Sequence, residues 1–509
     1  MCGFVVTTKI DQCRKMMNKA SFRGPDGTYY WADDKIAMAH ALLDISAEKT
    51  IQPYKTSRGN RLVFNGEMYD SNIPSDTEFL AEGLETYGIR FLEFTDWHGS
   101  IVYYEPKNKR LTVVRDHFGA KPLWIRREKG HIELATSLRS FLTKNIDQNY
   151  ANKWHNRKWK GPGWMSVGRE SMWKGIHKVA PGEFYTFEGD NFENVVVGNL
   201  WNGHHIRNNK MNESKFEERC VSSVKKLAKS KQKTGHFLSG GLDSTLVLSI
   251  IKELDLDLTV YIAAYDKTPG FFHTHEGFRN ESEMAVETCK QFGVPYKVLK
   301  LDPHSRWHYD RMWLNNTHYI WTDSNRRAPR YMLAKAAAKD KCKVITTGDS
   351  GDELFSGYIH HAKRYNVDYC KDYIENMKKA KWFPRMNWSN TDWFNNTLFC
   401  DLLTTSETNI LQADQTAGMF GMEARPVLLG QDFVRWLLWQ SGNFKFQQLP
   451  EYREGETKYL ARETMSRWQP DHVRFRKKKV GWSSPWDNNH KQLLRLWSLQ
   501  DVEYLKGIT

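Results

Sequence analysis

An α/β domain built on a parallel β-sheet is the fold class that the sequence predicts for residues 215–509. Short apolar runs with strand character alternate there with segments whose apolar residues recur at helical spacing, which is typical of a sheet covered by helices on both faces. Two of the strands end in glycine-rich turns that carry hydroxyl and carboxylate side chains. Because ligands bind beyond the carboxyl ends of the strands in such sheets, we expect both turns to belong to a ligand site.

The first of these turns runs from Ser239 to Thr245 and reads Ser-Gly-Gly-Leu-Asp-Ser-Thr. Residues 235–238 end a buried strand before it, and residues 246–252 continue as a helix. The two glycines let the backbone approach a ligand closely, and the hydroxyls and amide N–H groups at the helix N-terminus suit a phosphate. Because Asp243 would repel a bare phosphate, we expect a magnesium ion between this carboxylate and the phosphates.

The second turn reads Gly-Asp-Ser-Gly-Asp-Glu and begins at Gly348. Its three acidic side chains repel one another unless a cation compensates their charge. We therefore expect Asp352 and Asp243 to form a carboxylate pair that binds Mg²⁺ on the phosphates of ATP. The further strands expected in this sheet cover residues 258–264, 294–299 and 342–347, with a helix that begins near residue 280.

The N-terminal part begins with a candidate nucleophile, Cys2, followed by an apolar strand at residues 4–6. If Met1 is removed, Cys2 carries a free α-amine whose reference pKa of about 8 lets it act as the base for its own thiol. Asn65 and Gly66 lie where a strand enters a turn, and an amide side chain beside a glycine N–H can form an oxyanion hole. Losing one such donor typically costs about 100- to 1000-fold in rate.

Bulk composition is that of a globular protein with two or three domains, and residues 203–213 form the expected linker. The net charge of +14 makes a nucleic-acid partner a hypothesis worth weighing, but no nucleic-acid-binding signature accompanies the basic residues, and we expect none. The seven cysteines are widely spaced, and their odd number favours a reducing cytoplasm. No stretch approaches the roughly 20 apolar residues of a membrane span, so no membrane partner is expected.

Several N-terminal motifs, taken in chain order, match the pattern of one family. They are Cys2, Arg-Gly-Pro-Asp-Gly at 23–27, Asn-Gly-Glu at 65–67, Ser-Asp at 75–76 and Arg-Asp-x-Phe-Gly-x-Lys-Pro-Leu at 115–123. Together they resemble the class II glutamine amidotransferase domain. The resemblance implies an α+β N-terminal-nucleophile fold over residues 2–200, in which two antiparallel sheets pack between helices as an αββα sandwich.

The turn at Ser239 resembles the pyrophosphate loop of the ATP pyrophosphatases. With Gly-Asp-x-Gly-Asp-Glu-Leu-Phe-x-Gly-Tyr at 348–358, behind an amidotransferase domain, the chain is similar to the asparagine synthetase family. The resemblance implies an ATP-pyrophosphatase domain over residues 215–509 whose C-terminal part is mostly helical. It also covers Lys-Val-Gly-Trp at 479–482, whose lysine would stabilise developing charge.

The resemblance implies a role for each matching residue. Catalytic roles fall on Cys2, Asn65, Gly66, Asp349 and Lys479. Glutamine contacts fall on Arg23, Asn65, Gly66, Glu67 and Asp76, with Asp76 placed for the α-ammonium. ATP contacts fall on Leu238, Ser239, Gly240, Gly241, Asp243, Ser244, Thr347 and Gly348, and the metal ligands are Asp243 and Asp352.

Two positions depart from the family pattern. Leu42 stands where the family usually carries the arginine that binds the α-carboxylate of glutamine, which removes a charge-assisted contact. Either Arg23 or Arg61 substitutes for it, or the amide donor binds weakly or differs from glutamine. Gly430 replaces an aspartate that usually follows the Gly-x-Glu-x-Arg segment at 421–425.

The resemblance therefore predicts a glutamine-hydrolysing asparagine synthetase or a close relative. It would convert aspartate, glutamine and ATP to asparagine, glutamate, AMP and pyrophosphate, with ammonia passing along an apolar path inside the protein. One alternative is an amidotransferase of the same architecture that acts on another carboxylate, either with an amide donor or with free ammonia. A β-lactam-forming relative has less support, since such enzymes need no Cys2. A relic without amidase activity and a basic nucleic-acid-binding protein on an inactive synthetase scaffold are the remaining alternatives, and a homodimer is left open.

Overall fold

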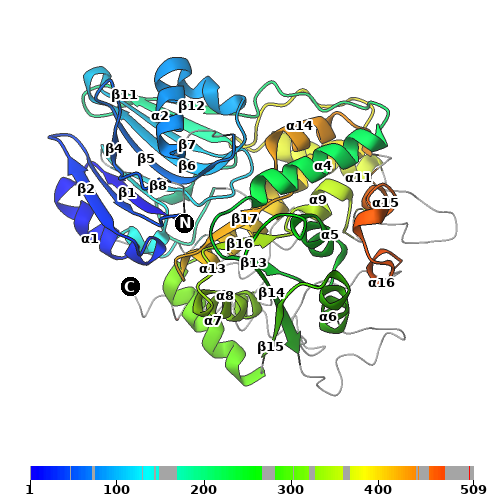
Figure 1. Cartoon of the computed structure of the whole chain (residues 1–509). Coiled ribbons are helices and arrows are strands. Elements are labelled where there is room, and N and C mark those ends of the chain that lie inside the picture. Colours follow the sequence, from blue (N-terminus) through cyan, green and yellow to red (C-terminus); the bar gives the residue numbers. More distant parts are fainter. Residues whose placement is uncertain are drawn as a thin grey trace.

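The computed structural model describes most of the chain as three β-sheets with their covering helices (Figure 1). Lys479 lies outside the described residues. Among the residues described, no helix is both long and apolar enough to cross a membrane. The described residues are 2–45, 48–70, 75–128, 130–142, 145–147, 149, 169–265, 281–301, 303–319, 327–358, 361, 367–442, 445, 458–475 and 504.

Two antiparallel six-stranded sheets make up the N-terminal half. The first has the order β10-β8-β9-β1-β3-β2 and the second β12-β11-β7-β6-β5-β4. The strands of the first sheet are β1 (Gly3–Thr7), β2 (Thr28–Ala32), β3 (Ala37–Ala41), β8 (Trp124–Glu128), β9 (His131–Ala135) and β10 (Ile176–Lys178). Those of the second are β4 (Tyr54–Lys55), β5 (Arg61–Met68), β6 (Trp97–Glu105), β7 (Arg110–Arg115), β11 (Glu183–Glu188) and β12 (Asn194–Asn199).

Side-chain alternation along the strands explains why these sheets stack between helices. In β1, Phe4 and Val6 pack into the core between the two sheets, whereas Val5 points the other way, toward α1 (Cys13–Asn18). In β5, Phe64 packs with the buried face of α2 (Asp76–Tyr87) on the outside of the second sheet. The layers are therefore helix, sheet, sheet, helix, and the predicted αββα sandwich is confirmed.

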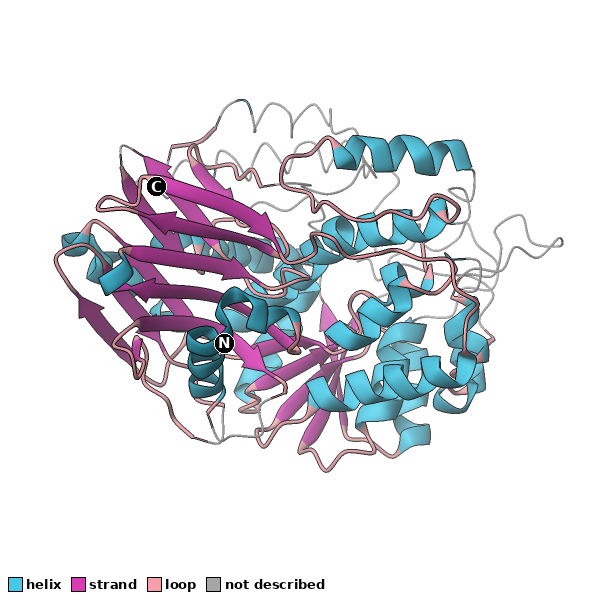
Figure 2. Cartoon of the chain, turned by 90° about the horizontal axis from the view of Figure 1, so that it is seen from above, coloured by secondary structure: helices cyan, strands magenta, loops and turns pink. Residues whose placement is uncertain are grey.

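The C-terminal half contains a five-stranded sheet with the order β15-β14-β13-β16-β17, and every neighbouring pair is parallel. Helices surround this smaller sheet, whereas the two N-terminal sheets lie stacked beside it (Figure 2). The predicted α/β class of this half is confirmed. The strands are β13 (Thr234–Phe237), β14 (Leu258–Tyr265), β15 (Tyr296–Leu301), β16 (Val344–Thr347) and β17 (Glu423–Pro426).

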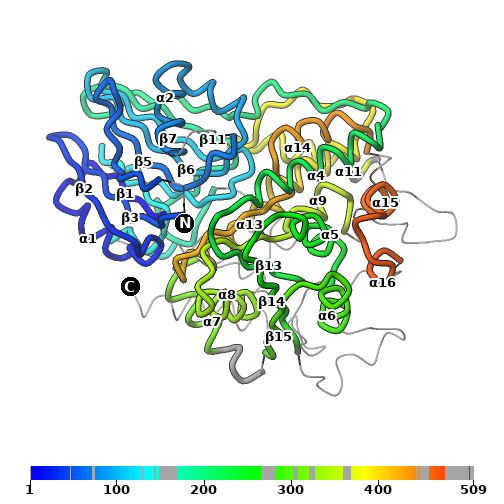
Figure 3. Tube along the Cα trace, in the orientation of Figure 1, coloured from blue at the N-terminus to red at the C-terminus, as the bar shows by residue number. Residues whose placement is uncertain are grey.

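Helices cover both faces of the parallel sheet because the strand residues that point to either face are apolar. Val260 and Ile262 of β14 pack with α4, α5 and α6, while Tyr261 and Ala263 pack with α8 and α13. Helices α4 and α14, far apart in the chain, run side by side (Figure 3). The helices are α4 (Glu213–Ala228), α5 (Leu242–Ile251), α6 (Glu281–Phe292), α7 (Pro303–Thr317), α8 (Arg327–Lys339), α9 (Gly351–Phe355), α11 (Val367–Lys378), α12 (Trp393–Asp401), α13 (Glu407–Gly418), α14 (Gln431–Leu438), α15 (Tyr459–Glu463) and α16 (Asp471–Arg474).

Helix α13 joins the two halves through buried ion pairs. Glu407 Oε2 lies 2.6 Å from Lys178 Nζ, and Glu407 Oε1 lies 2.8 Å from Arg115 Nη2. All three side chains are at most 4% exposed. Because both cations belong to the N-terminal half, the carboxylate neutralises charges that the sandwich could not leave buried alone.

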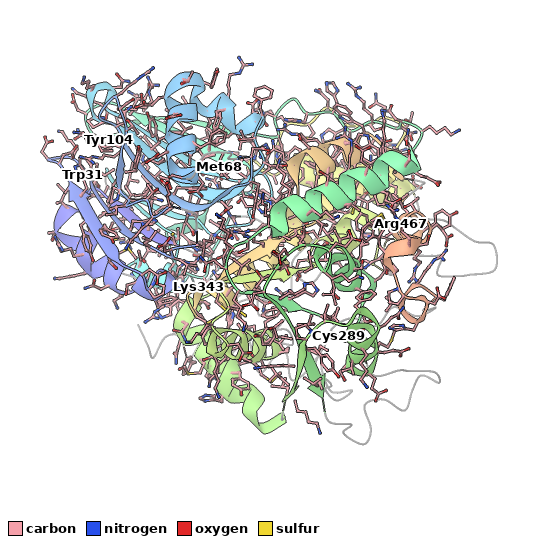
Figure 4. All side chains as sticks on the ribbon, viewed as in Figure 1. Trp31, Met68, Tyr104, Cys289, Lys343 and Arg467 are labelled. Atoms are coloured by element: carbon pink, nitrogen blue, oxygen red, sulfur yellow. The ribbon has the colours of Figure 1, made fainter. Side chains whose placement is uncertain are left out.

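A second carboxylate, Asp414, lies about two turns further along the same helix. Its Oδ2 is 2.9 Å from Arg23 Nη2, and its Oδ1 is 3.7 Å from Lys121 Nζ. Near the surface, Lys343 lies where the halves meet, with its Nζ 3.1 Å from Asp26 (Figure 4). The halves are therefore joined by charge pairs that water does not reach, in addition to apolar clusters to which both halves contribute.

We expect Glu407→Gln to destabilise the protein by about 3–5 kcal/mol, because it leaves two buried cations without their carboxylate. Urea unfolding measures this change. The matched control is Glu253→Gln, which breaks the exposed pair with Lys225 and should cost about 1 kcal/mol or less. Equal effects of the two substitutions would contradict the importance of the buried pair.

Candidate active site

Cys2 precedes β1 and lies in a pocket where the two halves meet. Its Sγ accepts a hydrogen bond from the backbone N–H of Leu43 at 3.4 Å. Burial raises the pKa of the Cys2 thiol to about 11, although the positive chain terminus and the Leu43 N–H act in the opposite direction. The thiol is therefore protonated at neutral pH and must transfer its proton to a base before it can attack a substrate.

Asn65 and Gly66 lie together on β5. The Asn65 side chain is fully buried, and neither its amide nitrogen nor its amide oxygen has a hydrogen-bond partner among the described residues. Leaving such a group unpaired costs about 1–3 kcal/mol, so a ligand that bonds to it gains that energy. At Gly66, a Cβ atom would come within 2.1 Å of the His98 carbonyl oxygen, so only glycine lets β5 and β6 lie this close.

The Cys2 pocket encloses about 400 Å³ of empty space, part of it open to solvent. One side is lined by Leu42, Leu43 and Ile45, and the charged lining consists of carboxyl groups. Glu67 and Asp76 come from the N-terminal half, whereas Glu423 comes from β17 of the other half. The pocket is therefore formed only when the two halves are docked.

Arg425 separates two of these carboxyl groups. Its Nε lies 2.8 Å from Glu423 Oε1, and its Nη2 lies 3.3 Å from Glu67 Oε2. Burial opposes ionisation of Glu423, but Lys121 and Arg425 lower its pKa to about 2. Burial raises the pKa of Glu67 to about 8, and burial together with the Glu423 charge raises the pKa of Asp76 to about 6. At neutral pH the pocket therefore keeps Glu423 and Asp76 ionised.

Neither arginine considered as a substitute at position 42 is among the described residues that line the pocket. Arg23 lies behind Cys2, where its Nε donates to the Cys2 carbonyl oxygen at 3.3 Å and its Nη2 to Asp414. Arg61 stacks over the Trp31 ring at 4.7 Å from its centroid. The glutamine contact assigned to Arg23 remains a prediction, and its observed contacts position the nucleophile's backbone.

The turn that begins at Ser239 connects β13 to α5 and folds back on itself. Ser244 Oγ accepts a hydrogen bond from the Ser239 N–H at 3.2 Å, and Gly241 precedes the first residue of α5. Gly240 has φ 74°, and a Cβ there would lie 2.3 Å from the Glu281 carbonyl oxygen. The backbone N–H groups at the start of α5 therefore face the carboxyl end of the sheet, as phosphate binding requires.

His236, which no motif singled out, anchors this turn. Its Nε2 is 2.9 Å from the Ser244 carbonyl oxygen, and its Nδ1 is 3.0 Å from Thr346 Oγ1. Burial lowers the pKa of His236 to about 4, so the ring is neutral at physiological pH. The imidazole, which belongs to β13, therefore connects the turn at Ser244 to Thr346 of β16.

The two glycine-rich turns are in direct contact. A Cβ at Gly351 would lie 2.3 Å from Asp243 Cγ, and one at Gly348 would lie 2.6 Å from the Ser244 backbone nitrogen. Both positions therefore need glycine for the turns to pack. The contact brings Asp243 and Asp352 to one place, although they are over one hundred residues apart in the chain.

Lys458 lies between these two carboxylates. Its Nζ is 2.7 Å from Asp352 Oδ1 and also donates to Asp243, and the residue is 5% exposed. Among the described residues, no group of three or more His, Cys, Asp or Glu side chains could hold a metal. A carboxylate pair that already takes one cation nevertheless fits magnesium, which usually binds one or two carboxylates together with phosphates and water.

Asp349 links the second turn to the interface helix. Its Oδ1 accepts a hydrogen bond from Arg330 Nη2 at 2.8 Å, and its Oδ2 has no partner within the described part of the chain. Arg330 also donates to the Asn409 carbonyl oxygen of α13 at 3.1 Å. Helix α13 is therefore linked to the second turn through Arg330, which bonds to Asn409, and to Cys2 through Arg23, which bonds to Asp414.

The remaining predicted positions lie around the same turns. Leu238 is buried directly after β13, and Thr347 ends β16 with an Oγ1 that has no partner among the residues described. At Gly430 a Cβ would lie 2.3 Å from Ser223 Oγ, so an aspartate does not fit there. Lys479 lies outside the described residues.

Sequence reasoning missed three side chains of the site: His236, Arg330 and Lys458. Each has at least one partner far away in the chain, namely Thr346 for His236, Asn409 for Arg330 and the two carboxylates for Lys458, and none stands in a recognisable motif. Only the alternation of strands and helices could have placed His236 near the turn. For Arg330 and Lys458 the sequence holds no comparable signal.

Comparison with known proteins assigns families to both halves. The sequence model described as asparagine synthase matches residues 215–503, and the one described as glutamine amidotransferase domain matches residues 1–201. The named relatives are distant in sequence and include both amidases and synthetases.

Amidase chyE of Penicillium rubens is 23% identical over 389 residues, covering 69% of this chain and 55% of that protein. Asparagine synthetase [glutamine-hydrolyzing] 1 of Bacillus subtilis is 24% identical over 392 residues, covering 70% of this chain and 59% of that protein. The chain thus spans a little over half the length of these relatives. With a family match that extends over more than half of its residues, behind an amidotransferase domain, this chain belongs to the asparagine synthase family.

Proposed function

We propose that this protein is an ATP-dependent amide-forming ligase. The N-terminal half would release ammonia from the carboxamide of glutamine, and the C-terminal half would adenylate the β-carboxylate of aspartate. Ammonia would then displace AMP and form asparagine. The observation that carries the proposal is the pairing, in one chain, of a nucleophile pocket at the interface with two contacting phosphate-type turns.

In the first half-reaction, the α-amine of Cys2 would accept the thiol proton once Met1 is removed. The thiolate would attack the amide carbon, and the Asn65 amide and the Gly66 N–H would stabilise the oxyanion. The unpaired Asn65 side chain supports this role, because it is already buried and no bond to a described residue has to break. Loss of ammonia would leave a thioester that water hydrolyses to glutamate.

In the second half-reaction, the N–H groups at the start of α5 and the hydroxyls of Ser239 and Ser244 would bind the pyrophosphate part of ATP. Magnesium bound by Asp243 and Asp352 would neutralise charge on these phosphates. Lys458 is close enough to both carboxylates to keep them together between turnovers. Attack of the substrate carboxylate on the α-phosphorus would release pyrophosphate.

Asp349 would act on the incoming nitrogen nucleophile or on the adenylate, as the family resemblance implies. Arg330 holds one of its oxygens, and the other faces no partner among the described residues.

The apolar ammonia path remains a prediction. Between Asn409 and Asp414, roughly 7.5 Å along the axis of α13, the helix carries the buried Gln412, whose amide atoms have no partner among the described residues.

A carboxylic acid other than aspartate remains an alternative substrate. One relative, about as similar to this chain in sequence as the synthetases are, is named an amidase. Product analysis decides whether aspartate or another acid is the substrate. The reactions contain ATP, magnesium, either glutamine or ammonium, and one member of a panel of carboxylic acids that includes aspartate. Asparagine with AMP and pyrophosphate supports the main proposal. Turnover of another acid, without asparagine formation, supports the alternative.

Cys2→Ala should abolish glutamine-dependent synthesis, because it removes the nucleophile, and should retain ammonium-dependent synthesis. The measurement is AMP formation with each nitrogen donor at saturating ATP. Cys13→Ala is the matched control, since Cys13 is buried in α1 away from the pocket. Loss of both activities in Cys2→Ala would contradict the division of labour between the halves.

Asp243→Asn should lower ATP–pyrophosphate exchange by about 100-fold or more, whichever nitrogen donor is present, because the phosphates lose their magnesium ligand. Glu375→Gln, which breaks an exposed pair with Lys378, serves as the control and should leave the exchange unchanged. A normal exchange rate in Asp243→Asn would rule out this carboxylate as a metal ligand.

The KM for the amide donor should rise as the pH falls through about 6. Asp76 has a raised pKa of about 6, so it loses the charge that attracts the donor's ammonium group below that pH. Ammonia release measured between pH 5 and pH 8 checks this. Asp76→Asn should have a high KM that no longer changes through this range, whereas an unchanged profile would assign the titration to another group.

A further inference from the structure

The charged side chains that line the Cys2 pocket are carboxyl groups, and among the described residues no lysine, arginine or histidine lines it. The rest of the wall beside the nucleophile is apolar, with Leu42 next to Leu43 and Ile45. A donor that carries its own carboxylate would leave water for a site with like charges and no basic side chain among the described lining residues. Burial of an unpaired charge is strongly unfavourable.

The neutral polar side chains of the lining do not compensate for the missing basic side chain, because they already take part in hydrogen bonds. Thr50 Oγ1 lies 2.6 Å from Ser75 Oγ. Gln52 Nε2 donates to Thr77 Oγ1 at 3.1 Å, and Gln52 Oε1 accepts from the Phe64 N–H at 2.6 Å. These side chains are neutral, and a carboxylate would have to compete with existing hydrogen bonds for most of their donors.

The cations behind the pocket are occupied as well. Arg23 is bonded to Asp414, Arg425 to Glu423 and Glu67, and the Lys121 ammonium to the Ala424 carbonyl oxygen. In the sequence, the short segments 46–47 and 71–74 beside the lining residues contain no basic residue. The exposed Lys49 precedes the lining residue Thr50, so it is the cation that an experiment has to exclude.

An amine, in contrast, is well matched to this pocket. Asp76 accepts hydrogen bonds from Thr77 and from the Met68 N–H, and no basic side chain pairs with it among the described residues. An ammonium group on the donor would supply the missing positive charge. The pocket therefore selects for an amine and against a carboxylate on the same small amide.

We propose that this site prefers, over glutamine, a primary carboxamide that carries an ammonium group and no α-carboxylate, and that Leu42 sets this preference. The compound that isolates this difference is 4-aminobutanamide, which is glutamine with hydrogen in place of the α-carboxylate. The proposal rests on the proposed function, in which Cys2 opens a carboxamide. The thiolate forms the C–S bond, the C–N bond breaks, the α-ammonium of Cys2 returns its proton to the leaving ammonia, and water hydrolyses the thioester to 4-aminobutanoate.

The test measures ammonia release by the full chain from 4-aminobutanamide and from L-glutamine at pH 7.5. We expect kcat/KM to be at least tenfold higher for 4-aminobutanamide. A value for glutamine that equals or exceeds it overturns the proposal and leaves the proposed ligase intact. If neither amide releases ammonia while ammonium still supports synthesis, both this proposal and the proposed amidase step fail.

Leu42→Arg should reverse the preference, since a guanidinium beside the acidic wall can pair with a carboxylate. We expect kcat/KM for glutamine to rise at least tenfold and that for 4-aminobutanamide to fall. Leu42→Met, of similar size and no charge, should keep the wild-type preference. Circular dichroism and the melting midpoint establish that Leu42→Arg is folded, and a folded variant without a gain on glutamine overturns the role of Leu42.

Lys49→Ala excludes the remaining cation. We expect its ratio of kcat/KM values for the two amides to equal that of the wild type. A selective loss of glutamine turnover in Lys49→Ala would show that Lys49 binds the α-carboxylate, and would overturn the proposal.

Discussion

Buried charge pairs between α13 and the N-terminal sandwich are the constraint on which the rest of the molecule depends. Glu407 and Asp414 come from the C-terminal half, and the lysines and arginines that they meet come from the other half. Separated, each half would expose or bury unpaired charges at this surface, and such charges are costly to bury without their partners. The pairs also set the orientation of the halves, because each carboxylate must reach its own cations.

That orientation decides where chemistry can occur. Glu423 completes the wall of the Cys2 pocket only because β17 lies against the sandwich, and Arg23 contacts both Cys2 and Asp414. On the other side, Arg330 connects α13 to Asp349. Helix α13 therefore contacts residues next to both candidate sites. A displacement of α13 would move Arg23 beside Cys2 and Arg330 beside Asp349.

The two sites differ in charge. At the nucleotide turns, the N-terminus of α5 and the Lys458 ammonium provide positive potential next to Asp243 and Asp352, which suits phosphates together with a metal. In the Cys2 pocket, the charged side chains of the lining are carboxyl groups, and Leu42 adds apolar surface. Family membership alone does not explain this second environment. It follows from the pairing of Glu67 and Glu423 with Arg425 and from the absence of a cation among the described lining residues.

The sequence by itself determined the fold class of both halves and the local chemistry of each motif. Glycines at the turns, the continuous apolar runs of β1 and β14, and the order of strands and helices are local properties that the chain reveals without folding. Tertiary structure decided what the motifs meet. The bond between His236 and Thr346, the position of Lys458 between the two carboxylates and that of Glu423 in the Cys2 pocket all depend on residues far apart in the chain. Such contacts depend on how sheets and helices dock, and docking is set by packing and charge pairing over the whole interface, which no short motif records.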